Sequence, residues 1–169
     1  VKPVNEGSSI GMSKVRAAVG LEEAYALAVN YDRAVMAEKF IEGSELTAGI
    51  LGEQALPLIK LETPRDFYDY QAKYIADDTR YLIPCGLPAA REREIQQLCL
   101  CAFRALGCSG WGRVDLMLDR GGDPWLLEVN TAPGMTSHSL VPKAARSRGI
   151  EFDELVWRVL ETSMPERSS

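Results

Sequence analysis

Three segments of the chain carry apolar residues at the spacing of an amphipathic helix. The first predicts a helix over residues 20–31, and the last predicts one from Phe152 to Leu160. Between them, Ile95, Leu98, Cys99, Phe103 and Leu106 predict a helix that ends at Gly107 and buries Cys99. A shorter helix is expected after Ser139, which we expect to cap it.

Strand-like runs separate these helices. Residues 1–4 and 34–40 read as single strands, and residues 45–51 and 55–61 flank Gly52-Glu53 as a hairpin. A second hairpin is expected from residues 109–118 and 125–130 around Gly121-Gly122. This order predicts an α+β fold with antiparallel sheets and helices packed on one face.

Residues 63–86 form a long, polar and aromatic-rich segment that we expect to be a loop. Loops of this length are uncommon and often act as lids over active sites. The alternative is a disordered surface loop.

The second hairpin carries the most informative chemistry. A two-residue turn at Gly121-Gly122 would place Asp115 opposite Glu128 and Arg113 opposite Asn130. Opposed side chains project to the same face, so one register gathers all four polar groups. The apolar residues between them would then face the core: Val114, Leu116, Leu118, Leu127 and Val129.

Two opposed carboxylates repel each other, and a divalent cation would resolve that repulsion. Asp115, Glu128 and the amide oxygen of Asn130 suit a hard ion such as Mg²⁺, while Arg113 suits an anion. The alternative is a solvated polar cluster on the outer face of a sheet. The NTAPGM sequence that follows favours the metal, because its Pro-Gly turn brings backbone N–H groups beside it.

Two lysines and a small-residue loop in the first forty residues suit a phosphate. The EGSSIG segment after Lys2 offers backbone amides and hydroxyls, although it lacks the spacing of a Walker loop. Lys39 ends a predicted strand beside Phe40 and Ile41, which offer an apolar surface to a base. The alternative for Lys39 is an ordinary exposed lysine.

Composition narrows the classes of protein further. The 169 residues are 46% hydrophobic with a net charge of −5, which suits a folded domain and argues against a nucleic-acid binder. No apolar run is long enough to cross a membrane. Four cysteines without paired spacing and a single histidine argue against a zinc site and favour a reducing, cytoplasmic setting.

Taken together and in this order, the motifs resemble those of ATP-grasp enzymes, and more narrowly D-alanine–D-alanine ligases. The matching stretches are VKPVNEGSSIGMSKV, EKFIEGSELTAGILG, FYDYQAKYIADDTRYLIPCGL, GCSGWGRVDLMLD and LLEVNTAPGMTSHSLVP. The resemblance implies an ATP-grasp fold and ATP-dependent joining of two D-alanine molecules through an acyl phosphate, for peptidoglycan precursors and cell wall biogenesis.

The resemblance also implies roles for individual residues. ATP would contact Lys2, Lys39, Glu38, Phe40, Ile41, Glu45 and Met117. Two Mg²⁺ or Mn²⁺ ions would be held by Asp115, Glu128 and Asn130. The reacting groups would be held by Ser8, Arg113 and the N–H of Gly134, with Tyr74 favouring an amine as second substrate. The second substrate's carboxylate would meet Lys73, Ser139 and the N–H of Leu140.

Members of this family have a longer N-terminal part, so we expect that domain to be absent here and the isolated chain to be inactive. Residues 1–40 would end the central subdomain, 41–163 would form the C-terminal ATP-grasp domain, and 164–169 would be a polar tail. We expect D-alanine to be the substrate and the protein to form a homodimer. Two alternatives stay open: another ATP-grasp carboxylate–amine ligase, and a non-catalytic nucleotide-binding module.

Overall fold

The structure is a computed structural model, and it describes residues 1–7, 9–62 and 79–164. These residues form two compact units, one containing Val1–Ile41 and the other containing Glu42–Glu62 and the residues from Tyr81 onward. The predicted α+β class with antiparallel strands is confirmed. No helix among the described residues is long and apolar enough to cross a bilayer.

The first unit pairs two short strands beside one helix. Strand β1 (Lys2–Pro3) runs antiparallel to β2 (Val35–Met36), and the 3₁₀ helix η1 (Ala18–Gly20) leads into α1 (Leu21–Ala28). The predicted helix over 20–31 is too long, because the last N–H groups bond three residues back, as Tyr31 does to Ala28. The predicted strand over 34–40 is also too long, since β1 offers only two residues for pairing.

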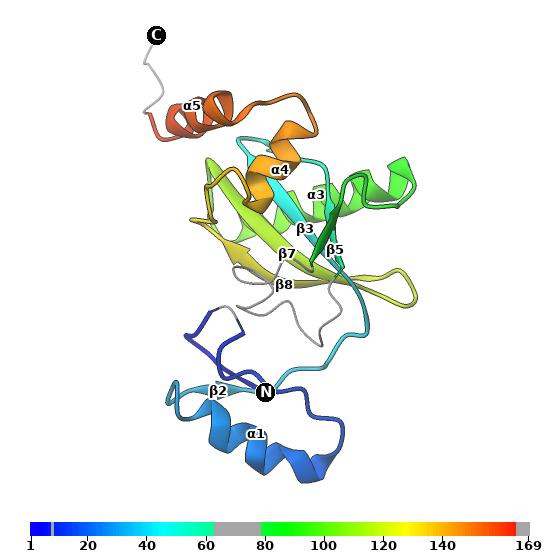
Figure 1. Ribbon diagram of the computed structural model, residues 1–169, viewed down its shortest axis with the longest axis vertical. Helices are drawn as coiled ribbons and strands as arrows, with labels where there is room; N and C mark the ends of the chain where they lie inside the picture. Colours follow the sequence, from blue (N-terminus) through cyan, green and yellow to red (C-terminus); the bar gives the residue numbers. More distant parts are fainter. Residues whose placement is uncertain (8, 63–78, 165–169) are drawn as a thin grey trace. The chain divides into compact units, whose positions relative to one another are not determined.

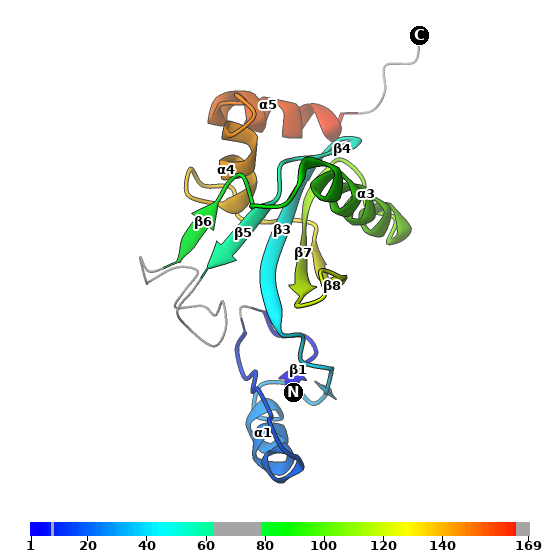
Figure 2. The same ribbon diagram turned by 90° about the vertical axis from the view of Figure 1, so that its right-hand side faces the viewer.

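The second unit is built on an antiparallel sheet with strand order β6-β5-β3-β7-β8 (Figure 2). The central strands β3 (Gly43–Leu51) and β7 (Trp111–Asp119) pair without interruption along their whole length. The remaining strands are β4 (Gln54–Ala55), β5 (Ile59–Glu62), β6 (Arg80–Leu82) and β8 (Pro124–Asn130). Side chains two apart on β3 or β7 therefore share a face of the sheet.

Helix α3 (Ala89–Ala105) covers one face of this sheet and forms the core with it (Figure 2). The core residues are Leu46, Ala48, Ile50, Leu58, Cys85, Ile95, Cys99, Leu100, Phe103, Val114 and Leu116. The predicted end at Gly107 is confirmed, because Gly107 has a positive φ of 73° and its N–H bonds to the carbonyl of Arg104. The helix begins directly after Pro88, before Ile95, the first apolar position on which the prediction was based.

The opposite face carries a second helix layer, so the prediction of helices on one face is wrong. Helix α4 (Leu140–Arg146) packs on β3, where a Cβ added to Gly49 would be in van der Waals contact with Val141 Cγ1 at 3.5 Å. The predicted last helix is confirmed as α5 (Phe152–Thr162), which packs against α4 (Figure 1). Ser139 occupies the N-cap position of α4, but its side chain does not cap the helix.

The first predicted hairpin is correct at its turn and wrong beyond it. Gly52 and Glu53 connect β3 to β4 as expected, with Gly52 at a φ of 57°. The partner strand then breaks at residues 56–58 before it resumes as β5. Two side chains of α3 satisfy the backbone there: Glu92 accepts the N–H of Leu58, and Gln96 donates to the carbonyl of Leu56.

The predicted loop over 63–86 is wrong at residues 80–82, which form β6. The lid prediction itself falls mainly on residues 63–78, which lie outside the described part of the chain.

Candidate functional site

Asp115 lies at the centre of a polar cluster on the α4 face of the sheet. Only 7% of the residue is exposed, because it sits in the middle of β7 between β3 and β8. Its carboxylate accepts two hydrogen bonds from the guanidinium of Arg113, at 2.8 Å from Nε and 2.7 Å from Nη2. This bidentate pair neutralises a charge that would otherwise be costly to bury.

Thr47 donates a further hydrogen bond to Oδ1 of Asp115 and was not predicted from the sequence. Thr47 faces Asp115 directly across β3 and β7, and its Oγ1 lies 2.6 Å from Asp115 Oδ1. Thr47 is 2% exposed, so its hydroxyl is shielded from water. Only the pairing of β3 with β7, which are far apart in sequence, could have identified this residue.

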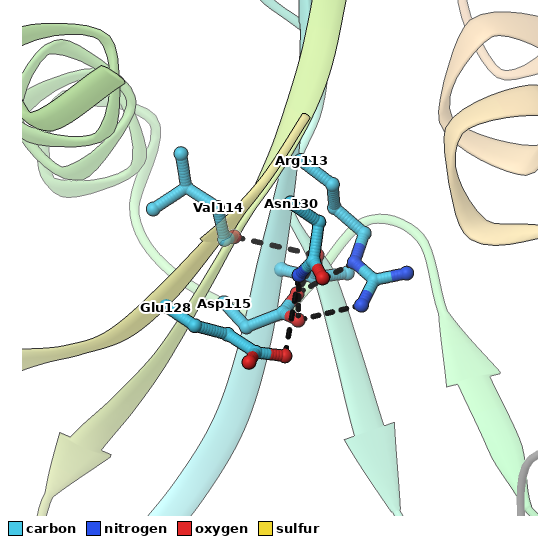
Figure 3. Close-up of polar contacts among 6 residues, drawn as sticks. Arg113, Val114, Asp115, Glu128 and Asn130 are labelled. Carbon is cyan, nitrogen blue, oxygen red and sulfur yellow. Dashed lines mark hydrogen bonds and ion pairs between the residues drawn. The ribbon is translucent and has the colours of Figure 1, made fainter. Parts of the chain in front are cut away.

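Glu128 faces Asp115 across β7 and β8, which confirms the predicted juxtaposition of the two acids. The Asn130 amide nitrogen bridges them, at 3.0 Å from Asp115 Oδ2 and 3.2 Å from Glu128 Oε1 (Figure 3). In Figure 3, Val114 points to the opposite side of the sheet from Arg113, Asp115 and Asn130. The two carboxylates are therefore close enough to share one positively polarised group.

The local route to this juxtaposition differs from the predicted one. The turn holds three residues, Arg120–Gly122, because the N–H of Asp119 bonds to the carbonyl of Asp123. A β-bulge between Asp115 and Leu116 then restores the register, with Leu127 as the extra residue of β8. Leu127 is consequently 44% exposed, so its predicted place in the core is wrong.

The donor atoms of this cluster fit a hard divalent cation. Carboxylate oxygens of Asp115 and Glu128 converge on one amide group, and oxygen ligands are those that Mg²⁺ and Mn²⁺ prefer. Asn130 presents its nitrogen to the carboxylates, so ligation through Oδ1 requires the amide to turn over. The described residues contain no group of three or more His, Cys, Asp and Glu side chains suited to a metal.

Two residues assigned to the nucleotide lie on the same face as Asp115. Met117 is two positions along β7, and Glu45 faces Met117 across β3 and β7. Both side chains are half-buried. The structure therefore brings these two residues together beside the acidic pair.

The remaining residues assigned to the nucleotide lie in the first unit. Lys2 pairs with Glu38, with 2.7 Å between Nζ and Oε1. Phe40, followed by Ile41, receives the ammonium of Lys14 over its ring at 3.7 Å from the centroid. Lys39 lies between Glu38 and Phe40 in the segment that leaves β2. The predicted Ser8 lies outside the described residues.

The segment before α4 brings Gly134 and Ser139 together. A Cβ added to Gly134 would lie 2.9 Å from Ser139 Oγ, so a larger residue at this position would displace the Ser139 hydroxyl. Ser139 Oγ instead accepts the N–H of Thr136 at 3.0 Å, and Leu140 is the buried first residue of α4. Lys73 and Tyr74 lie outside the described residues.

Lys143 holds this segment from α4 and was also missed by sequence reasoning. Its ammonium donates to the carbonyl of His138 and lies 4.8 Å from the centroid of the Tyr81 ring on β6. Burial, with a smaller contribution from the charge of Arg146, lowers the pKa of Lys143. An anion near the α4 N-terminus would therefore meet a partly desolvated cation.

Comparison with known proteins places these observations in one family. The sequence model of the family described as "D-ala D-ala ligase C-terminus" matches residues 1–161. A D-alanine–D-alanine ligase of Alkalilimnicola ehrlichii is 62% identical over 160 residues, which cover 95% of this chain and 51% of that protein.

Solved structures agree with this assignment at lower identity. A D-Ala:D-Ser ligase from Enterococcus faecalis has a TM-score of 0.85 at 33% identity, covering 96% of this chain and 48% of that one. A D-alanine–D-alanine ligase from Bacillus anthracis complexed with ATP has a TM-score of 0.73 at 31% identity, covering 88% and 47%.

The chain spans about half the length of the curated relatives it matches. The match nevertheless extends over nearly the whole chain and includes every described residue of the acidic cluster. The resemblance predicted from the sequence motifs is confirmed, and the chain belongs to the family of D-alanine–D-alanine ligase C-terminal regions.

Proposed function

We propose that the polypeptide carrying this chain joins two D-alanine molecules into D-alanyl-D-alanine at the expense of ATP, for peptidoglycan precursors. One observation carries the proposal: Asp115 and Glu128 face each other beside Arg113 in a chain 62% identical to a named D-alanine–D-alanine ligase. The carboxylates suit a cation that binds phosphate, and the neighbouring guanidinium suits a substrate carboxylate, so both reactants of a phosphoryl transfer could be bound side by side.

The acidic cluster would hold the cations. Asp115, Glu128 and Asn130 supply oxygen ligands for Mg²⁺ or Mn²⁺, and we expect two ions. Bound there, the cations would neutralise charge on the phosphate oxygens of ATP. The structure of the Bacillus anthracis relative is described as complexed with ATP, which supports ATP as the nucleotide.

The other assigned residues would bind ATP along its length. Lys2 and Lys39 would contact phosphates, and Glu38 with the backbone at Phe40 and Ile41 would meet the adenine. Lys2 would have to exchange its partner Glu38 for phosphate oxygens, which also accept charge-assisted hydrogen bonds. Glu45 and Met117 are suited to the ribose and the base because they share the face of Asp115.

The chemistry requires two successive nucleophilic attacks. The carboxylate of the first D-alanine attacks the γ-phosphorus, forming an acyl phosphate and releasing ADP. The amine of the second D-alanine then attacks the acyl carbon and phosphate leaves. Arg113 and the N–H of Gly134 would stabilise the oxyanion, with Ser8 orienting the first substrate and Tyr74 favouring an amine nucleophile.

Lys73, Ser139 and the N–H of Leu140 would hold the carboxylate of the second substrate. The carboxylate is common to D-alanine and D-serine, and the Enterococcus faecalis relative is named for D-serine, so this contact alone does not select between the two. Four free cysteines are consistent with the proposed cytoplasmic location. The homodimer stays a prediction.

The test is D-alanine-dependent release of phosphate from ATP by the full-length gene product, with D-alanyl-D-alanine identified by mass spectrometry. Turnover with D-alanine and not with other amino acids is expected. Turnover that requires a different carboxylate would favour another ATP-grasp ligase. Equilibrium binding of ATP without turnover on any substrate would favour the non-catalytic module.

A further inference from the structure

Thr47 contacts the metal-assigned Asp115 from β3. Its Oγ1 lies 2.6 Å from Asp115 Oδ1 and 3.4 Å from the carbonyl oxygen of Val114. A hydroxyl has a single hydrogen to donate, and the shorter distance directs it to the carboxylate. The buried hydroxyl therefore donates a charge-assisted hydrogen bond, the stronger kind of neutral-donor contact.

The environment of Thr47 leaves this hydroxyl little freedom. The residue is 2% exposed in the uninterrupted β3–β7 pairing, and its branched Cβ restricts χ1. The torsion that turns an aspartate carboxylate, by contrast, has a broad energy minimum. The orientation of the Asp115 carboxylate is thus set by its partners rather than by its own rotamer.

Those partners are divided between the two carboxylate oxygens. Oδ1 accepts from Thr47 and from Arg113 Nε, while Oδ2 accepts from Arg113 Nη2 and from the Asn130 amide that also reaches Glu128. Asn130 must turn its amide to become a ligand, and Arg113 is assigned to the substrate carboxylate. Thr47 is then the partner with no other assigned task.

We propose that Thr47 is a positioning residue that holds Oδ1 of Asp115, so that Oδ2 stays turned toward Glu128 for a divalent cation. This inference rests on the proposed function, because it takes Asp115 and Glu128 as cation ligands. Partners that orient a ligand from outside the coordination sphere commonly contribute tenfold to hundredfold to metal affinity. Without the hydroxyl, the orientation of the carboxylate depends on Arg113 and Asn130, both of which are assigned to other contacts once cation and substrate bind.

The test is a titration of the full-length protein with Mn²⁺ alone, followed by electron paramagnetic resonance of the free ion. Thr47→Val keeps the shape of the side chain and removes the hydroxyl, whereas Thr47→Ser keeps the hydroxyl. We expect Thr47→Val to bind Mn²⁺ at least about tenfold more weakly and Thr47→Ser to bind like the parent. Thr162→Val is the matched control, because the exposed Thr162 hydroxyl donates only to the carbonyl of Val159.

Thr47→Ala is the second variant without a hydroxyl, should valine fail to fold in this buried position. Metal-free thermal unfolding identifies the folded variants. Folded Thr47→Val or Thr47→Ala with unchanged Mn²⁺ affinity would overturn the role of Thr47 and leave the proposed function intact. A parent protein that binds no Mn²⁺ would overturn the metal assignment itself, and the role of Thr47 with it.

Discussion

Asp115 and Glu128 face each other because β8 contains one residue more than a regular ladder requires. Near the turn, Leu116 pairs with Leu126, whereas beyond the bulge Asp115 pairs with Glu128. Leu127 is the residue without a partner, and its side chain is exposed. The three-residue turn and the bulge thus compensate for each other, and the acids meet in the register that a two-residue turn would have given.

Deletion of Leu127 should therefore preserve the acidic pair. Removing the extra residue converts β8 into a regular partner of β7 that still places Glu128 opposite Asp115. Deletion of Val129, in contrast, moves Asn130 into a position that faces α3 and removes it from Arg113. Mn²⁺ titration should find binding retained after the first deletion and lost after the second; loss after both would show that the bulge itself is required.

The sequence predicts this hairpin because its two strands are neighbours along the chain and alternation alone assigns their faces. The exposed Leu127 was missed because a bulge changes that alternation at one residue. Thr47 and Lys143 were missed for another reason: each acts on a partner brought near by strand or helix packing between distant segments. Local periodicity contains no information on such pairings.

Element lengths show the same limit. Gly107 ends α3 as predicted because the signal is a single residue at a local position. The strand after Ala34 was overestimated because its length depends on β1, a partner of two residues. Helices were expected on one face, and only the packing of Val141 on Gly49 reveals the second layer.

Asp115→Asn should lower the free energy of unfolding, unlike Glu128→Gln. The side chains of Arg113 and Asp115 are only 15% and 10% exposed, so the substitution removes a charged acceptor from a largely buried guanidinium. We expect a loss of about 3 kcal/mol for Asp115→Asn and a change within about 0.5 kcal/mol for the exposed Glu128. Urea denaturation without metal measures both, and equal losses would contradict the buried ion pair.

Both substitutions should nevertheless weaken Mn²⁺ binding. Each removes one negative charge from the proposed ligand pair. Glu128→Gln is therefore expected to lower metal affinity without lowering stability, whereas Asp115→Asn is expected to lower both. Glu128→Gln is thus the cleaner probe of the metal assignment, and Mn²⁺ affinity unchanged by it would exclude Glu128 as a ligand.

Cys99 and Cys101 should differ sharply toward alkylating reagents. Cys99 is fully buried in the core between α3 and the sheet, and this burial raises the pKa of its thiol to about 12. Cys101, two residues along the same helix, is exposed. At pH 8, iodoacetamide should modify Cys101 in the folded protein and Cys99 only after unfolding. Peptide mass spectrometry identifies the sites, and modification of Cys99 at the rate of Cys101 would contradict the core assignment.

The same thiol gives stability a defined dependence on pH. The folded-state pKa of Cys99 exceeds the ordinary value of 9.0, so the folded state keeps a proton that the unfolded chain releases. This contribution to stability is complete below pH 9 and declines as the pH rises toward 12. Cys99→Ala should remove that decline at the cost of a small cavity, and urea denaturation at pH 8 and pH 10 compares the two proteins.

Lys143 should hold the segment that carries Gly134 in place. Its ammonium donates to the carbonyl of His138 and lies over the ring of Tyr81, so one side chain of α4 connects that segment to β6. Lys143→Met keeps the aliphatic stem and removes both polar contacts, each of which stabilises by roughly 0.5–1 kcal/mol. We therefore expect amide hydrogen exchange over residues 131–138 to become several-fold faster in Lys143→Met, with β7 unchanged as the internal reference. Lys143→Arg retains a cation and should exchange at close to the parent rate. Equal protection in the methionine variant would mean that the Thr136–Ser139 hydrogen bonds hold the segment without Lys143.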